Sequence, residues 1–207
     1  MRFFVAFVLA GSLLLSGVDS GSCQMADPEI GSAAPTFTLP DTHGYEHNLA
    51  DYAGKWVVLE WLNYGCPFVR KHYDSGNMQS LQSRYGAQGV VWLSIVSSAV
   101  GEQGYYEPTE MNRMNGENGN KAAAVLLDPE GTVGLQYGAK TTPQMYVIDP
   151  EGILLYNGAI DDRPTSRVED VEGATSYLVQ AMTEALAGDS VTVPTTQPYG
   201  CGVKYKR

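Results

Sequence analysis

Apolar residues along this chain gather in short unbroken runs more often than they alternate with polar ones. Residues 57–62 and 90–96 are two such runs, and each is typical of a parallel strand covered on both faces. Residues 67–85 between them predict one helix, which ends at Gly86 and Gly89. The first half of the chain is therefore predicted to form a strand, a helix and a second strand.

The second half continues this alternation. Residues 123–127 predict a strand and residues 132–137 a short helix, while apolar residues at helical spacing predict a last helix over 171–186. Residues 145–148 and 153–156 predict two strands joined by an Asp-Pro-Glu-Gly turn. Strands and helices in this order predict an α/β fold, with a central mixed β-sheet flanked by helices.

The N-terminus predicts export. An apolar run over residues 3–15 is shorter than the about 20 residues of a membrane-spanning helix, and it suits a secretory signal peptide over residues 1–22. Small residues at 20–22 supply a cleavage site just before Cys23. We expect a periplasmic or extracellular protein. The alternative is a bacterial lipoprotein signal with Cys23 lipidated, and only in that case do we expect contact with a membrane.

Without residues 1–22 the chain keeps its formal net charge of −10. Such an acidic protein is not expected to bind nucleic acid, which requires clustered Lys and Arg. The about 185 remaining residues are enough for one domain with its own core. We place that domain at residues 28–190. Residues 191–207 then form an extended C-terminal tail, which contains Pro and Gly and carries Cys201.

Neither a metal nor a cofactor is expected. A metal site built from His43 and His47 needs two further ligands that the sequence does not reveal. His72 lies six residues after Cys66 and therefore off its helical face. Three cysteines are also too few for a disulfide scaffold.

Cys66 is the strongest candidate for chemistry. It follows a predicted strand and a Gly turn, and it precedes Pro67, a residue suited to the first position of a helix. A thiol at that position lies beside the free N–H groups of the helix, where the positive end of the dipole stabilises a thiolate. The alternative is a buried, unreactive cysteine.

Two segments resemble a known family. Residues 31–39 and 54–59 look like the opening of the redoxin domains, the branch of the thioredoxin fold that includes the alkyl hydroperoxide reductase/thiol-specific antioxidant proteins. Thr142 and Pro143, just before the strand at 145–148, look like the cis-proline loop of that fold. The resemblance covers residues 30–187. It implies that this loop lies beside the reactive cysteine and helps to hold a peptide or thiol substrate.

The chain departs from both well-known forms of this family. Thioredoxins use Cys-x-x-Cys, but neither Asn63 nor Val69 is a cysteine. Typical peroxiredoxins carry Pro-x-x-x-Thr-x-x-Cys, and here Leu59 and Asn63 replace the Pro and the Thr. The arginine that pairs with a peroxiredoxin thiolate would fall near Pro143, where there is none.

We therefore expect an exported thiol oxidoreductase, most simply a peroxiredoxin-like peroxide reductase, with Cys66 as the nucleophile. Cys201 is the expected resolving cysteine, because Gly200 and Gly202 would let a mobile tail bring it to Cys66. One alternative is a thiol-disulfide oxidoreductase of the thioredoxin-like type. The other is a non-catalytic binding module that presents the Thr142-Pro143 loop. The expected partners are a peroxide or disulfide substrate and a thiol reductant or partner protein.

The neighbours of Cys66 leave several roles open. Asn63 and Pro67 are expected to join Thr142 and Pro143 at the substrate, although Asn63 is equally suited to shaping the turn.

Arg70 and Lys71 follow Cys66 within about a turn of helix. They are candidates for stabilising the thiolate, and the simpler expectation is that they are solvated residues. Arg163 is a candidate for the missing arginine, and pairing with Asp161 or Asp162 is the simpler expectation.

Overall fold

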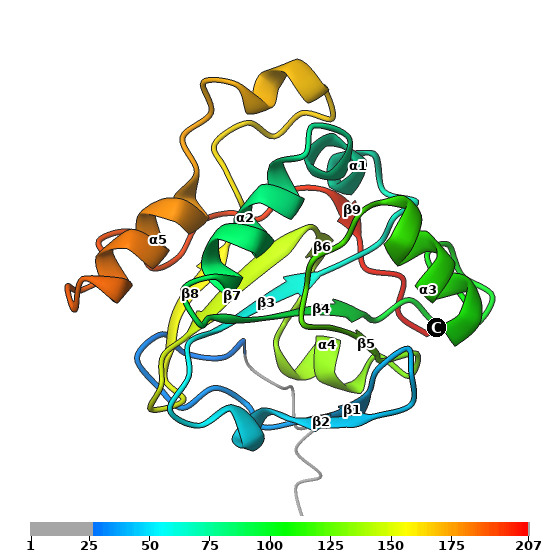
Figure 1. Cartoon of the computed structure of the whole chain (residues 1–207), viewed down its shortest axis with the longest axis horizontal. Helices are drawn as coiled ribbons and strands as arrows, with labels where there is room; N and C mark the ends of the chain where they lie inside the picture. Colours follow the sequence, from blue (N-terminus) through cyan, green and yellow to red (C-terminus); the bar gives the residue numbers. More distant parts are fainter. Residues whose placement is uncertain (1–26, 207) are drawn as a thin grey trace, which may run out of the picture.

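The computed structural model describes residues 27–206 (Figure 1). Its centre is a five-stranded sheet in the order β5-β4-β3-β7-β8. The first three strands are parallel, and β7 and β8 are antiparallel, so the sheet is mixed as predicted. The strands are β3 (Val57–Trp61), β4 (Val91–Val96), β5 (Ala124–Leu127), β7 (Gln144–Ile148) and β8 (Leu154–Gly158).

Two layers cover the sheet. One face packs against α1 (Pro67–Asp74), α2 (Asn77–Gly86) and α5 (Tyr177–Leu186), and α3 (Pro108–Glu117) adds Met111 to the same core. The other face packs against α4 (Thr132–Gln136) and a hairpin of β1 (Thr38–Pro40) and β2 (Glu46–Asn48), followed by the 3₁₀ helix η1 (Leu49–Tyr52) (Figure 1). Every residue of β3 is buried, because both of its faces are covered.

Two of the predicted helices are shorter than expected. The predicted helix over 67–85 is two helices, because Ser75 ends α1 and Gly76 takes a left-handed conformation (φ 73°) before α2. The predicted helix over 171–186 begins only at Tyr177, where the Ser176 hydroxyl accepts a hydrogen bond from the Val179 N–H and caps it. The residues before it form a 3₁₀ helix, η2 (Val168–Val171), and a turn.

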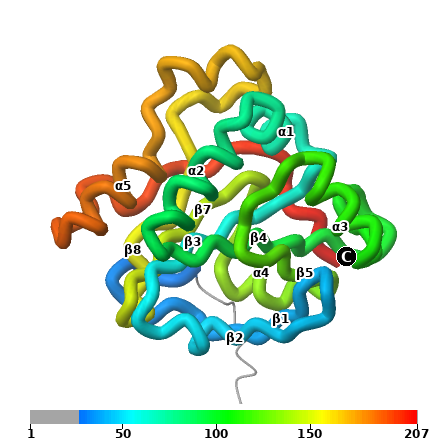
Figure 2. Tube along the Cα trace, in the orientation of Figure 1, coloured from blue at the N-terminus to red at the C-terminus, as the bar shows by residue number. Residues whose placement is uncertain are grey.

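The C-terminal tail is extended and is packed along the molecule. It passes beside β8, where Asn157 and Thr195 form a parallel bridge. It then forms β9 (Cys201–Gly202), antiparallel to β6 (Thr141–Thr142). Figure 2 shows the tail crossing from the side of α5 to the side of α3.

Three further hydrogen bonds hold the end of this tail. The Val203 N–H donates to the Lys140 carbonyl, and the Lys204 carbonyl accepts from Ala99 N–H (N···O 2.8 Å). The Tyr205 hydroxyl donates to the Ala139 carbonyl (2.6 Å). The tail is therefore part of the folded domain.

Candidate active site

Cys66 is the N-cap residue of α1, and Pro67 is the first residue of that helix, as the sequence predicts. Its backbone N–H donates to the Asn63 carbonyl (3.0 Å), which closes the turn after β3. Its thiol donates to the Thr142 carbonyl, with a sulfur–oxygen distance of 3.0 Å. The Cys66 sulfur therefore lies between the start of α1 and the loop of Thr142 and Pro143.

The peptide bond between Thr142 and Pro143 is cis, as the resemblance implies. Thr142 is buried, and its carbonyl faces the sulfur of Cys66. Two segments that are 76 residues apart in the chain thus meet at one sulfur atom.

Cys201 lies at the same place. In the ladder between β6 and β9 it is the residue opposite Thr142, and its backbone N–H donates to the Cys66 sulfur (3.4 Å). Both cysteines are free thiols. Burial, together with the hydrogen bond to Cys66 and the charge there, raises the pKa of the Cys201 thiol to about 12. Cys201 therefore keeps its proton at neutral pH.

Gly200 makes this close approach possible. Its φ is 139°, a conformation that residues with a side chain rarely adopt, and a Cβ there would lie 2.0 Å from the Thr142 carbonyl oxygen. Gly202, on the other side of Cys201, has no such constraint, since the nearest atom to its Cβ position is 3.9 Å away. Gly200 thus permits tight packing of the tail against Thr142.

Lys71 is one of the most buried side chains of the site, which corrects the expectation of a solvated residue. Its side chain is 0% exposed, and its ammonium lies 3.3 Å from an Asp161 carboxylate oxygen. It also donates to the Arg163 carbonyl (2.8 Å) and to the Tyr199 hydroxyl (3.4 Å). Buried charges need such paired and hydrogen-bonded surroundings.

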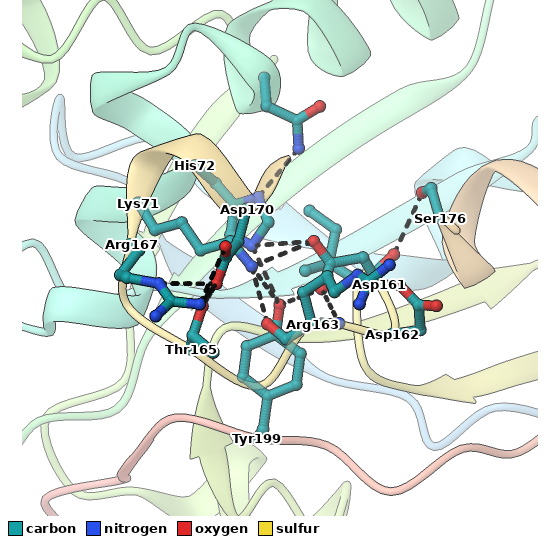
Figure 3. A network of polar contacts seen from close by, with 12 residues as sticks. Lys71, His72, Asp161, Asp162, Arg163, Thr165, Arg167, Asp170, Ser176 and Tyr199 are labelled. Atoms are coloured by element: carbon teal, nitrogen blue, oxygen red, sulfur yellow. Dashed lines mark hydrogen bonds and ion pairs between the residues drawn. The ribbon is translucent and has the colours of Figure 1, made fainter. Parts of the chain in front are cut away.

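Tyr199 and His72 complete this cluster, whose side chains point toward one another in Figure 3. The Tyr199 hydroxyl donates to the second carboxylate oxygen of Asp161, and His72 Nε2 lies 3.2 Å from the same hydroxyl. The Asn77 side-chain amide lies 2.9 Å from His72 Nδ1, so the tautomer consistent with both contacts carries its proton on Nε2. Burial, the largest effect, lowers the pKa of His72 to about 4, and the ring is neutral at pH 7.

The two arginines proposed as thiolate stabilisers are directed elsewhere. Arg70 is exposed and lies 3.6 Å from Asp74, and the Arg163 guanidinium lies 3.5 Å from Asp162. Pairing of Arg163 with a neighbouring aspartate was the simpler expectation, and it is confirmed. Asn63 takes the turn-forming role, since its side-chain oxygen accepts from the Gly65 N–H (2.8 Å).

Sequence reasoning missed Glu60, a fully buried carboxyl group in β3. It accepts hydrogen bonds from Tyr73, Gln82, Trp92 and Ser94. Burial raises the pKa of this carboxyl above its ordinary value, although these hydrogen bonds oppose that effect. A charged residue within an apolar strand was the only signal.

The Asn120 amide extends this group toward the turn before Cys66. It donates to the hydroxyls of Tyr73 (3.2 Å) and Tyr64 (2.9 Å). Tyr64 and Trp61, which flank the turn, are both buried and pack in the core.

Within residues 27–206, no group of three or more His, Cys, Asp and Glu side chains is arranged to hold a metal. His47 instead contacts Asp41 and Tyr52. No helix in this part of the chain has the length and apolar character needed to cross a membrane. The predicted signal peptide and Cys23 lie outside the described residues.

Similar structures carry the same fold. An uncharacterized conserved protein from Geobacillus kaustophilus is 26% identical, with a TM-score of 0.75 over 86% of this chain and 93% of its own. The thioredoxin domain of a thiol-disulfide oxidoreductase from Bacteroides vulgatus matches with a TM-score of 0.52 and 19% identity, over 70% of this chain and 97% of its own. The predicted thioredoxin-like fold is confirmed.

Curated relatives are thiol-disulfide oxidoreductases. The protein ResA of Geobacillus kaustophilus is 30% identical over 73% of this chain and 82% of its own length. ResA of Geobacillus thermodenitrificans is 31% identical over 59% of this chain, and the match spans 65% of that protein. These relatives confirm the expected class of enzyme, a thiol oxidoreductase. Residues 30–157 match the model of the AhpC/TSA family, and the chain belongs to that family.

Proposed function

We propose that this protein is a thiol-disulfide oxidoreductase in which Cys66 attacks the substrate disulfide and Cys201 resolves the mixed disulfide. One observation carries the proposal: the backbone N–H of Cys201 lies 3.4 Å from the Cys66 sulfur, with both thiols free. The strand pair of β6 and β9 thus supplies the second cysteine that a Cys-x-x-Cys sequence would otherwise place on α1.

In the first step the Cys66 thiolate attacks one sulfur of a substrate disulfide. A new bond forms between Cys66 and that sulfur, and the second substrate sulfur leaves as a thiolate that takes up a proton. The N-terminus of α1 stabilises the attacking thiolate. The Thr142 carbonyl lies 3.0 Å from the sulfur, and Thr142 and Pro143 form the expected substrate loop.

In the second step Cys201 loses its proton and attacks the Cys66 sulfur. The bond from Cys66 to the substrate breaks, the remaining substrate thiolate is released, and the Cys66–Cys201 disulfide forms. The two protein thiols have then supplied two electrons to the substrate. An external dithiol, as reductant or partner protein, restores them. The same steps in reverse oxidise a partner.

Export, by a signal peptide over residues 1–22, belongs to the same proposal. A periplasmic or extracellular location would give the two cysteines disulfide partners to exchange with. Lipidation of Cys23 remains the alternative and would place the domain at a membrane surface.

Peroxide reduction, our first expectation from the sequence, is the second candidate, because the match to the AhpC/TSA family favours it. Cys66 would attack a peroxide oxygen, releasing an alcohol or water, and the resulting sulfenic acid would condense with Cys201 and release water. The relatives named above favour disulfide exchange instead. Neither Arg70 nor Arg163 directs its charge to the sulfur, since each pairs with an aspartate.

The test mixes the reduced protein, in separate experiments, with oxidised glutathione and with hydrogen peroxide. We expect rapid formation of the Cys66–Cys201 disulfide with oxidised glutathione. Cys201→Ser should instead accumulate a mixed disulfide of Cys66 with glutathione, and Cys66→Ser should not react at the site. Cys23→Ser is the matched control and should behave as the parent. If Cys201→Ser releases glutathione as fast as the parent, Cys201 is not the resolving residue.

A further inference from the structure

The tail has two opposed effects on Cys66. Cys66 is 0% exposed in the fold, and β9 lies directly against it. An outside disulfide therefore reaches the sulfur only after the tail lifts away. Resolution, in contrast, requires the tail to return, because Cys201 is part of it. The contacts between the tail and the rest of the molecule determine the equilibrium between its lifted and returned positions.

Tyr199, two residues before Cys201, contacts α1 through both its ring and its hydroxyl. Its ring packs edge-to-face against Phe68, with the ring centres 5.9 Å apart, and its hydroxyl lies within the cluster of Lys71, His72 and Asp161 (Figure 3). Burial and the hydrogen bond to Asp161 raise the pKa of this hydroxyl, so that it remains a donor.

Helix α1 connects this cluster to the reacting sulfur. Cys66 caps the helix, and Phe68, Lys71 and His72 belong to it. A tyrosine seated against Phe68 and Lys71 is therefore positioned relative to the same rigid helix that holds the Cys66 sulfur. The two-residue distance to Cys201 leaves the second thiol little freedom.

The Lys71–Asp161 pair keeps its other partners when Tyr199 moves away. Lys71 remains paired with Asp161 and bonded to the Arg163 carbonyl, and the Arg163 N–H donates to the Asp161 carboxylate (2.9 Å). The charged groups thus keep partners in the lifted state, while the returned tail adds a hydrogen bond to a buried carboxylate.

We propose that Tyr199 is a positioning residue that latches the C-terminal tail over Cys66 through the Lys71–Asp161 pair, presenting Cys201 to the Cys66 sulfur and excluding outside reagents until the tail lifts. This inference rests on the proposed role of Cys201. If the latch is lost, Cys66 must react faster with outside reagents. Its disulfide with Cys201 must also become weaker.

The test is Tyr199→Phe, which keeps the ring against Phe68 and removes only the hydroxyl. In a Cys201→Ser background, we expect alkylation of Cys66 by iodoacetamide, followed by peptide mass, to rise roughly tenfold. In the background with both cysteines, equilibration with reduced and oxidised glutathione measures the effective concentration of Cys201 at Cys66. We expect it to fall roughly tenfold.

Tyr137→Phe is the matched control. It removes a buried hydroxyl that donates to the Pro35 carbonyl (2.6 Å), in the core on the face of the sheet opposite α1, and it therefore reports the effect of general destabilisation alone. It should leave both quantities within twofold of the parent.

Alkylation that is unchanged in Tyr199→Phe, or that rises equally in Tyr137→Phe, overturns the latch. So does an unchanged effective concentration. Failure of the proposed function looks different: Cys201→Ser would then release glutathione as fast as the parent, while the alkylation experiment would still report on the tail.

Discussion

His72 shows how one side chain depends on its surroundings. Its ring is 0% exposed, and its Nε2 lies 3.2 Å from the Tyr199 hydroxyl and 3.8 Å from an Asp161 oxygen. The pKa of His72 is about 4 in the fold, below the ordinary value of about 6.5. The unfolded chain therefore binds a proton at a higher pH than the folded protein does.

This difference predicts the pH dependence of stability. The contribution of His72 to the free energy of unfolding is fully present above about pH 6.5, and it is lost as the pH falls from there toward 4, by about 3 kcal/mol in total. Urea unfolding at pH 7.5 and pH 5 measures the difference. His72→Gln should remove most of it, whereas the exposed His43→Gln should retain it. Equal pH dependence in His72→Gln and the parent would contradict the assignment.

Single residues also show where sequence-based prediction stops. Cys66 and Pro67 could be placed at a helix start because that signal is local, within a few residues of strand, turn and helix. Lys71 could not be recognised as buried, since its partner Asp161 lies 90 residues away. A lysine on an amphipathic helix is ordinarily solvated, and only the tertiary fold supplies the carboxylate that changes this.

Helices and strands, like single residues, could be predicted where their signals are local and could not be predicted where they depend on a distant partner. The strands of the central sheet were predictable because each is a short apolar run with its own turn signals. The break between α1 and α2 at Gly76 was not predicted, although this glycine is a local signal for the end of a helix. The pairing of β9 with β6 was not predictable, because two residues of tail carry no periodicity and their partner lies in a distant loop.

The pair of glycines around Cys201 makes β9 testable. Gly200→Ala would place a Cβ 2.0 Å from the Thr142 oxygen at a φ of 139°, so β9 must move away from β6. We expect the effective concentration of Cys201 at Cys66 to fall more than tenfold, measured against glutathione. Gly202→Ala, with 3.9 Å of space, should change it less than twofold. Similar losses in both variants would show that the strand pairing does not position Cys201.

For the whole molecule, the two thiols join the ends of a very long loop. Cys66 and Cys201 are 135 residues apart, and a disulfide between them would restrict most of the unfolded chain. We expect the oxidised protein to be more stable than the reduced one by roughly 3–5 kcal/mol, a loop-entropy estimate.

Scanning calorimetry of the oxidised and reduced forms measures this difference as a rise in Tm of about 10 °C on oxidation. Cys201→Ser is the control and should show no such rise. A lower Tm for the oxidised form would show that closing the bond distorts the site, and it would make the disulfide a strong oxidant.

The separation of 135 residues also ties redox capacity to the folded state. A Cys-x-x-Cys pair stays close together even in an unfolded chain, whereas these two thiols are neighbours only while β6 and β9 are paired. Heat or denaturant that separates the strands leaves two independent thiols, each free to cross-link with other chains. Covalent aggregates, with loss of the intramolecular bond, should then be the characteristic damage of this protein under stress.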